Sequence, residues 1–178
     1  LKYAAAWSKI QVNATGSGST CDSPRFVDNG NATVTDKLTS LTWEKKTNKD
    51  GVLNFADRHD ADNFYSWTLG TTAADGNLFT DFLATLNATC FAGACDWRLP
   101  TAVELQTLLV GAAPCPTDPC IDPIFGPTNI FYVTATDLST EAAPSFVEDV
   151  WFGAPFPGLL AGSAKTNVKY GRAVRGGL

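Results

Sequence analysis

The chain has 178 residues, of which 44% are hydrophobic and 17% are charged. This length and composition suit one globular domain with a single core and exclude a disordered chain. The longest apolar stretches fall short of the roughly 18 residues that a membrane-spanning helix requires. The net charge of -5, without a basic stripe, argues against partners such as DNA, RNA and sulfated glycans, whose binders use basic surfaces.

The first residue and the cysteines of the sequence favour an exported protein. The sequence begins at Leu1 and contains no Met, so we expect that a signal, a leader or other residues preceded it. The five cysteines include two close pairs, which are typical of disulfides in an oxidising compartment. Together these features favour an exported protein.

Residues 1–20 are expected to form an N-terminal arm and linker, and residues 21–178 the domain. Partial alternation of apolar side chains over residues 7–12 favours a short strand, and the Gly- and Ser-containing segment that follows is typical of a flexible linker. Burying an apolar side chain stabilises by roughly 1.5–3 kcal/mol. We therefore expect the arm to pack on its own sheet, or on a neighbouring copy as an added strand.

The body of the domain is expected to start with strands. Residues 25–47 are predicted to form a β-hairpin or meander, because Asn29-Gly30 supplies the positive φ angles of a tight turn. A second turn is expected at residues 36–40. Residues 48–77 are polar and are expected to be mostly loop.

Two helices are predicted in the middle of the chain. Over residues 78–86 the apolar side chains recur at helical spacing and fall on one face. The second helix begins after Thr101 as N-cap, and Glu104 at the third helical position completes a capping box. Gly111 is expected to end this helix.

Strand signals return in the last third of the chain, after a Pro-rich segment. They lie at residues 130–136, 146–152 and 165–174. Strands, two helices, a long irregular loop and again strands predict an α+β fold with a segregated antiparallel sheet.

Four of the cysteines are predicted to form disulfides, Cys90–Cys95 and Cys115–Cys120. A zinc site with four thiolates is the alternative that such spacings allow. The exported context and the Pro-flanked second loop favour disulfides. Cys21 is predicted to be unpaired within the chain.

Neither catalytic residues nor a metal site nor a cofactor is predicted. His59 is the only histidine, so a Ser-His-Asp or Cys-His arrangement would have to use it, and it is expected to be a solvent-exposed loop residue. Residues 28–39 resemble a calcium loop, but Thr39 stands where the bidentate Glu is needed, so a hairpin turn is the better interpretation.

Three Asn-Ala-Thr sequons are optional glycosylation sites, at Asn13, Asn31 and Asn87. They can act as acceptors only where they are exposed and where the cell has the machinery.

The tryptophans divide into core and surface candidates. Trp43 lies in an apolar strand and Trp97 lies beside Leu-Pro, so both are expected in the core. Trp151 lies next to a Gly- and Pro-containing loop, and is the candidate for an aromatic side chain that stacks on a ligand.

Several segments occur together, in order, in one known family. The chain resembles the bacterial domain family named for the C-terminal domain of a collagen-like adhesin, over residues 24–177. The segments are Arg25-Phe26-Val27-Asp28-Asn29-Gly30 with Thr33-Val34-Thr35-Asp36, Leu41-Thr42-Trp43-Glu44-Lys45-Lys46, Asp96-Trp97-Arg98-Leu99-Pro100-Thr101 through Glu104-Leu105, Ile121-Asp122-Pro123-Ile124-Phe125-Gly126-Pro127-Thr128, and Arg172-Ala173-Val174-Arg175-Gly176-Gly177.

The resemblance implies a C-type lectin-like fold, export to the bacterial surface, and adhesion or ligand binding without a catalytic role. Where the family usually has Tyr-Trp-Ser-Ser-Thr, this chain has Tyr132-Val133-Thr134-Ala135-Thr136, so an aromatic side chain near the presumed loop region is lost. Tyr132 and Trp151 are the candidate ligand-binding residues. The segment from Arg98 also resembles formylglycine-generating enzymes, but these hold copper on late cysteines, and no cysteine follows Cys120. Arg98 is expected to be tied to a carboxylate or to loop carbonyls, which would hold the helix start.

Two functions therefore remain as hypotheses. The first is a non-enzymatic, secreted or surface-attached lectin-like module that binds a glycan or a protein. The second is a structural subunit of an extracellular filament, assembled from copies of the chain through the N-terminal arm.

Overall fold

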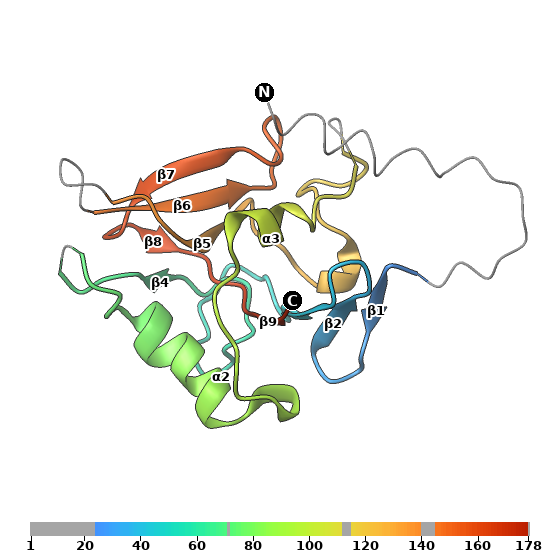
Figure 1. The fold of residues 1–178 in the computed structure, drawn as a ribbon, viewed down its shortest axis with the longest axis horizontal. Coiled ribbons are helices and arrows are strands. Elements are labelled where there is room, and N and C mark those ends of the chain that lie inside the picture. The colour runs from blue at the N-terminus through green and yellow to red at the C-terminus, as the bar shows by residue number, and fades with distance from the viewer. Residues whose placement is uncertain (1–23, 71, 112–114, 140–144, 178) are drawn as a thin grey trace, which may run out of the picture.

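The structure, a computed structural model, describes residues 24–70, 72–111, 115–139 and 145–177. The predicted arm and linker lie outside these ranges, as do Asn13 and Cys21. Within them the strands form three antiparallel sheets, and the helical segments are short (Figure 1). The predicted α+β class is confirmed, but the prediction of a single segregated sheet is wrong.

The first sheet is the predicted meander with one strand added from the far end of the chain. It contains β1 (Phe26–Asp28), β2 (Thr33–Asp36), β3 (Leu41–Glu44) and β9 (Val174–Gly176), in that order. The first turn forms at Gly30, whose φ is 73° and whose N–H donates to the Asp28 carboxylate at 2.9 Å. This sheet joins the N-terminal and C-terminal parts of the domain.

The remaining strands form a three-stranded sheet and a short pair. The three-stranded sheet has the order β5 (Phe131–Asp137), β6 (Phe146–Trp151), β7 (Leu160–Ala164), and the pair joins β4 (Tyr65–Ser66) to β8 (Val168–Lys169). The strand predicted over residues 165–174 is wrong, because this segment is split between β8 and β9 in different sheets. The small residues of β7 gave no strand signal.

The two predicted helices are confirmed, with different ends. A π-helical segment η1 (Leu78–Leu83) runs into α2 (Ala84–Ala88), and a one-turn segment η2 (Phe91–Gly93) follows. The later helix, α3 (Ala102–Gln106), carries the predicted capping box and ends well before Gly111. Beyond it the chain continues in tighter turns, in which the Leu108 and Leu109 N–H groups donate to the Leu105 and Gln106 carbonyls, at 3.0 and 3.2 Å, and the Thr107 carbonyl accepts from Arg25 at 2.9 Å. A last one-turn segment is η3 (Pro123–Phe125).

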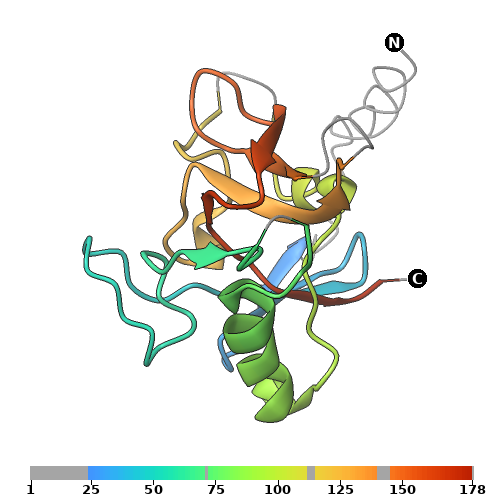
Figure 2. The same ribbon diagram turned by 90° about the vertical axis from the view of Figure 1, so that its left-hand side faces the viewer.

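The apolar interior has two parts, on either side of the β5-β6-β7 sheet. Alternation along the strands places Tyr132 and Val150 in the part that contains Trp43 and α3, and Val133 in the part that contains Trp97 and η1. Trp43 and Trp97 are buried, as predicted. Figures 1 and 2 both show this sheet at one end of the molecule and α2 at the other.

Among the described residues, no helix is long and apolar enough to span a bilayer.

Candidate functional site

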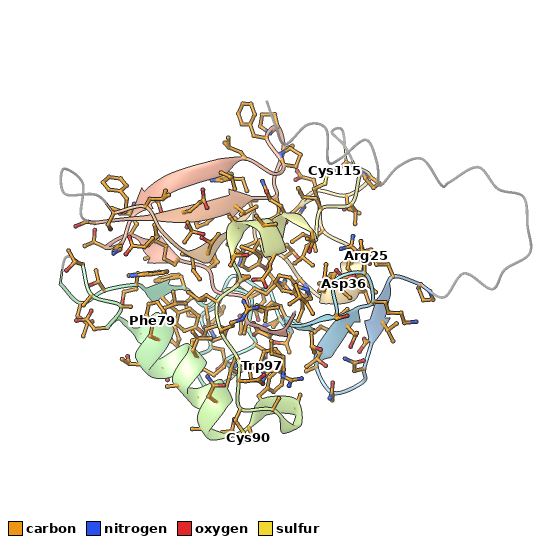
Figure 3. All side chains as sticks on the ribbon, in the orientation of Figure 1. Arg25, Asp36, Phe79, Cys90, Trp97 and Cys115 are labelled. Atoms are coloured by element: carbon orange, nitrogen blue, oxygen red, sulfur yellow. A yellow bond between two sulfur atoms is a disulfide. The ribbon has the colours of Figure 1, made fainter. Side chains whose placement is uncertain are left out.

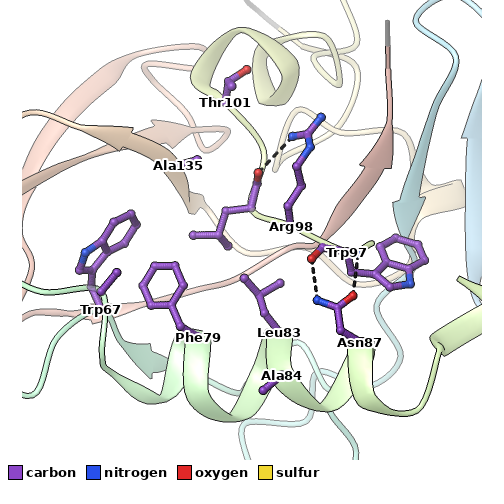
Figure 4. Close-up of a pocket in the computed structure, with 11 residues that line it drawn as sticks. Trp67, Phe79, Leu83, Ala84, Asn87, Trp97, Arg98, Thr101 and Ala135 are labelled. Carbon is purple, nitrogen blue, oxygen red and sulfur yellow. Dashed lines mark hydrogen bonds between the residues drawn. The ribbon is translucent and has the colours of Figure 1, made fainter. Parts of the chain in front are cut away.

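One concavity is an apolar groove of about 610 Å³ between the η1–α2 helix and the segment that leads into α3 (Figure 4). Aromatic and aliphatic side chains form its walls, and three exposed alanines lie at its mouth. Its lining residues are Trp67, Ala74, Phe79, Leu83, Ala84, Asn87, Trp97, Arg98, Leu99, Thr101 and Ala135. We call this feature the groove.

The aromatic end of the groove is built by the contact between β4 and the start of η1. Phe79 packs edge-on against Trp67, with 4.8 Å between ring centroids. The Asn77 side-chain oxygen accepts from the Ser66 N–H at 2.6 Å, which fixes the helix start beside the strand. Only glycine fits at position 76, because a Cβ there would lie 2.2 Å from the Ser66 carbonyl oxygen.

The opposite end of the groove is fastened by Asn87. Its amide nitrogen donates to the Trp97 carbonyl at 2.9 Å, and its oxygen accepts from the Trp97 N–H at 2.7 Å (Figure 4). Asn87 therefore holds α2 against the segment before α3. Its amide nitrogen is the atom that a glycan would occupy, and a glycan there would replace one of its two hydrogens, so glycosylation at Asn87 stays a prediction. Asn31 is exposed in the first turn, where glycosylation stays a prediction.

The polar rim of the groove consists of groups that satisfy one another. The Arg98 guanidinium donates to both carboxylate oxygens of Glu104, at 2.8 and 2.7 Å, and to the carbonyls of Leu99 and Gly176. Although burial raises the pKa of Glu104, hydrogen bonds from Arg98 and from the Thr101 N–H hold it below its usual value. The predicted role of Arg98 in holding the helix start is confirmed.

These contacts decide what the groove can do chemically. The polar groups of Arg98 and Asn87 form most of their hydrogen bonds within the protein. The groove therefore offers mainly apolar and aromatic surface to a ligand. None of its lining residues pairs a nucleophile with a base. Such a surface suits an apolar side chain or the apolar face of a sugar ring.

A comparison with protein-family models gave one result. The model of the Lcl C-terminal domain family matches residues 32–175. The chain belongs to the Lcl C-terminal domain family. The matched segment contains all the residues that line the groove, and β1 precedes it. Comparisons with curated proteins and with solved structures gave no significant match, so a C-type lectin-like fold stays a prediction.

The two aromatic residues predicted to bind ligand in this Lcl C-terminal domain do not lie together. Trp151, at the end of β6, is half-buried and stacks on Phe131, with 5.5 Å between ring centroids. Tyr132 is fully buried, and its hydroxyl accepts from Asn129 N–H and from Arg172. The prediction of Tyr132 as a ligand residue is therefore wrong: it follows Phe131 on β5 and so points to the opposite face, into the core.

His59 is not the exposed loop residue that the sequence predicts. Its Nδ1 lies 2.9 Å from the Glu44 carboxylate, which also accepts from Lys46 at 2.8 Å and from the Ala173 N–H at 2.9 Å. We call these residues the Glu44 cluster. Burial raises the pKa of Glu44, but Lys46 and His59 outweigh it and bring the pKa to about 2. The cluster joins β3 to the loop before β4 and to the C-terminal segment.

The predicted calcium-like loop is a turn, as the better interpretation had it. Asp28 binds Gly30 and Lys45, and Asp36 receives two hydrogen bonds from Arg25, at 2.8 and 2.6 Å. No group of three or more potential metal ligands occurs among the described residues.

Both predicted disulfides, Cys90–Cys95 and Cys115–Cys120, are present in the Lcl C-terminal domain. Figure 3 shows Cys90 beyond the end of α2 and Cys115 in the loop that follows α3, in separate parts of the molecule. Each bridge closes a short loop. They fix local segments and do not connect the sheets to each other.

Proposed function

We propose that this chain is a non-enzymatic adhesion module, secreted or held on a bacterial cell surface, which binds a glycan or protein ligand in the groove. Membership of the Lcl C-terminal domain family supports the coarser part of this proposal, an adhesin-related surface module. The observation that carries the finer part is the groove itself: aromatic walls, small side chains at the mouth and polar groups that are already paired.

The geometry of the mouth supports the entry of a ligand with a flat or narrow apolar face. Ala74, Ala84 and Ala135 are exposed there, and Phe79 is the partly exposed member of the aromatic pair, while Trp67 is buried behind it. The net charge of -5 favours neutral glycans over sulfated ones, because an acidic protein repels sulfate groups.

Filling the mouth of the groove tests the proposal. In Ala84→Phe the added ring occupies the groove without removing any core side chain, so we expect binding on a glycan array, or to an immobilised protein ligand, to fall at least tenfold. Ala88→Phe makes the same change on an exposed position of the same helix outside the groove, and should bind as the wild type. Equal binding by both variants would refute the groove as the site.

Trp151 provides the competing site on the same array. It stacks on Phe131 near the loop that precedes β7, away from the groove lining. If Trp151→Ala abolishes binding and Ala84→Phe does not, the ligand lies on this aromatic pair instead.

A second candidate function, a filament subunit, is favoured by the edges of the sheets. Both β1 and β7 have only one neighbouring strand among the described residues, so each offers main-chain groups to an added strand. The predicted N-terminal arm of another copy is the proposed occupant. Deleting residues 1–12 tests this: large oligomers that disappear on truncation support the filament, and a full-length chain that is monomeric refutes it.

A further inference from the structure

Three polar side chains from three different strands meet between the β5-β6-β7 sheet and the β4–β8 pair. They are Asp149 on β6, Ser163 on β7 and Lys169 on β8. The side chains of Asp149 and Lys169 are almost fully buried, with exposed fractions of 5% and 1%, and Ser163 is half-buried. Neither the groove nor the Glu44 cluster includes them.

The contacts within this trio do not satisfy a buried ion pair. Lys169 Nζ lies 3.7 Å from Asp149 Oδ2, beyond hydrogen-bond distance. Ser163 lies between them: its hydroxyl donates to Asp149 Oδ2 and accepts from Lys169 Nζ. Asp149 Oδ1 is buried without a hydrogen-bond partner among the described residues. A buried ion pair is stable only when its remaining hydrogen bonds are made, so this one is poorly supported as charges.

Burial shifts both groups towards their uncharged forms, against the attraction between the two charges. Burial raises the pKa of Asp149, and burial lowers the pKa of Lys169. One proton that passes from Lys169 to Asp149 through the Ser163 hydroxyl converts the ion pair into a neutral amine and a carboxylic acid. The amine then has a free electron pair, and the acid carries a hydroxyl group that can leave.

We propose that Lys169 and Asp149 condense into an intramolecular amide bond that joins β6 to β8. The electron pair of Lys169 Nζ attacks Cγ of the protonated Asp149 carboxyl group and forms the new N–C bond. Ser163 accepts a proton from this nitrogen and passes its own to the carboxyl hydroxyl, whose C–O bond then breaks. One amide and one water molecule replace the amine and the acid, and no oxidant, reductant or cofactor takes part.

The fold supplies what this condensation needs. Rigid placement of the amine within a few ångströms of the carboxyl group acts as a very high effective concentration. The product replaces two charges in a low-dielectric site by one amide, whose oxygen can accept from Ser163. Because Ser163 is half-buried on the edge strand β7, the released water has a short path to solvent.

Mass spectrometry of the full chain tests the proposal directly. After reduction of the disulfides, we expect the intact protein to be lighter than its sequence by one water molecule. Peptide mapping should yield a branched peptide in which the segment around Asp149 is linked to the segment around Lys169. An intact mass equal to that of the reduced sequence overturns the proposal.

Variants and the position of the mass loss exclude other sources. Lys169→Met should restore the full mass, whereas Lys165→Met, which removes another buried lysine amine, should keep the loss. Asp-Gly sequences, such as Asp50-Gly51, can also lose water by ring closure. A loss that persists in Lys169→Met, or that maps to such a sequence without a branched peptide, refutes the amide.

Discussion

The Glu44 cluster predicts a specific dependence of stability on pH. Glu44 is fully buried, and its carboxylate is held by Lys46, by His59 and by the Ala173 N–H. Its pKa is about 2 in the folded protein, against 4.5 for the free side chain. Each pKa unit corresponds to about 1.4 kcal/mol, so the folded protein favours the ionised form of Glu44 by about 3 kcal/mol.

The sign follows from proton linkage. Because the folded-state pKa lies below the unfolded value, the stabilisation is fully present above about pH 4.5 and is lost as the pH falls towards 2. Glu44→Gln cannot bind this proton. We therefore expect the free energy of unfolding of the wild type to fall by about 3 kcal/mol more than that of Glu44→Gln between pH 5 and pH 2.

Urea unfolding, followed by tryptophan fluorescence at several pH values, measures this difference. Glu148→Gln controls for the change in net charge, because Glu148 has no ion-pair partner among the described residues. Lys46→Met should in addition cost about 3–5 kcal/mol at pH 7, since it leaves a buried carboxylate without its cation. Parallel pH profiles for the wild type and Glu44→Gln would refute the reasoning.

Three further changes test local features by the free energy of unfolding. Thr101→Ala should cost about 1 kcal/mol through loss of the N-cap, and Thr101→Ser should cost much less; equal costs would mean that the hydroxyl is not the cap. Gly126→Ala should cost about 3 kcal/mol or more, because the added Cβ would lie 2.0 Å from a carbonyl oxygen at a φ of +76°. Gly111→Ala, at a similar φ but with open space, should cost only about 1 kcal/mol, and an equal cost at both positions would contradict the clash. Replacing Cys90 and Cys95 together by Ser should cost about 2 kcal/mol, and peptide mapping without reductant should find them bonded; a zinc-dependent stability would overturn the disulfide.

Features with short-range causes could be predicted from the sequence. The capping box depends on Thr101 and Glu104, three residues apart, and the first turn depends on Gly30, although the second positive φ lies at Ala32 and not at Asn29 as predicted. Helical spacing of apolar residues likewise predicts the buried face of the η1–α2 helix, because the pattern and the packing have the same period.

Features that depend on contacts between distant residues could not be predicted from the sequence. Nothing near His59 in the sequence indicates that Glu44, fifteen residues earlier, binds its ring. Strand β7 has no apolar alternation, since its place is determined by pairing with β6. The sequence alone does not place Tyr132 in the core, because alternation does not say which face of a strand is covered.

The groove itself was missed for the same reason, because its lining comes from residues 67 to 135 and from several elements. The signal nearest to it is the apolar face of the η1–α2 helix, which extends to Phe79. This side chain is only partly covered by the core.

The pairing of β9 with β3 also bears on when the domain can fold. The meander β1-β2-β3 uses neighbouring residues and can form early, whereas β9 must return across more than a hundred residues to join it. The hydrogen bonds of the Glu44 carboxylate also remain incomplete until this segment is in place, because one of their donors is the Ala173 N–H. A chain emerging from a ribosome therefore cannot complete its first sheet until residues 174–176 are free. The pairing of β9 with β3 is therefore a late, long-range step in the folding of this sheet.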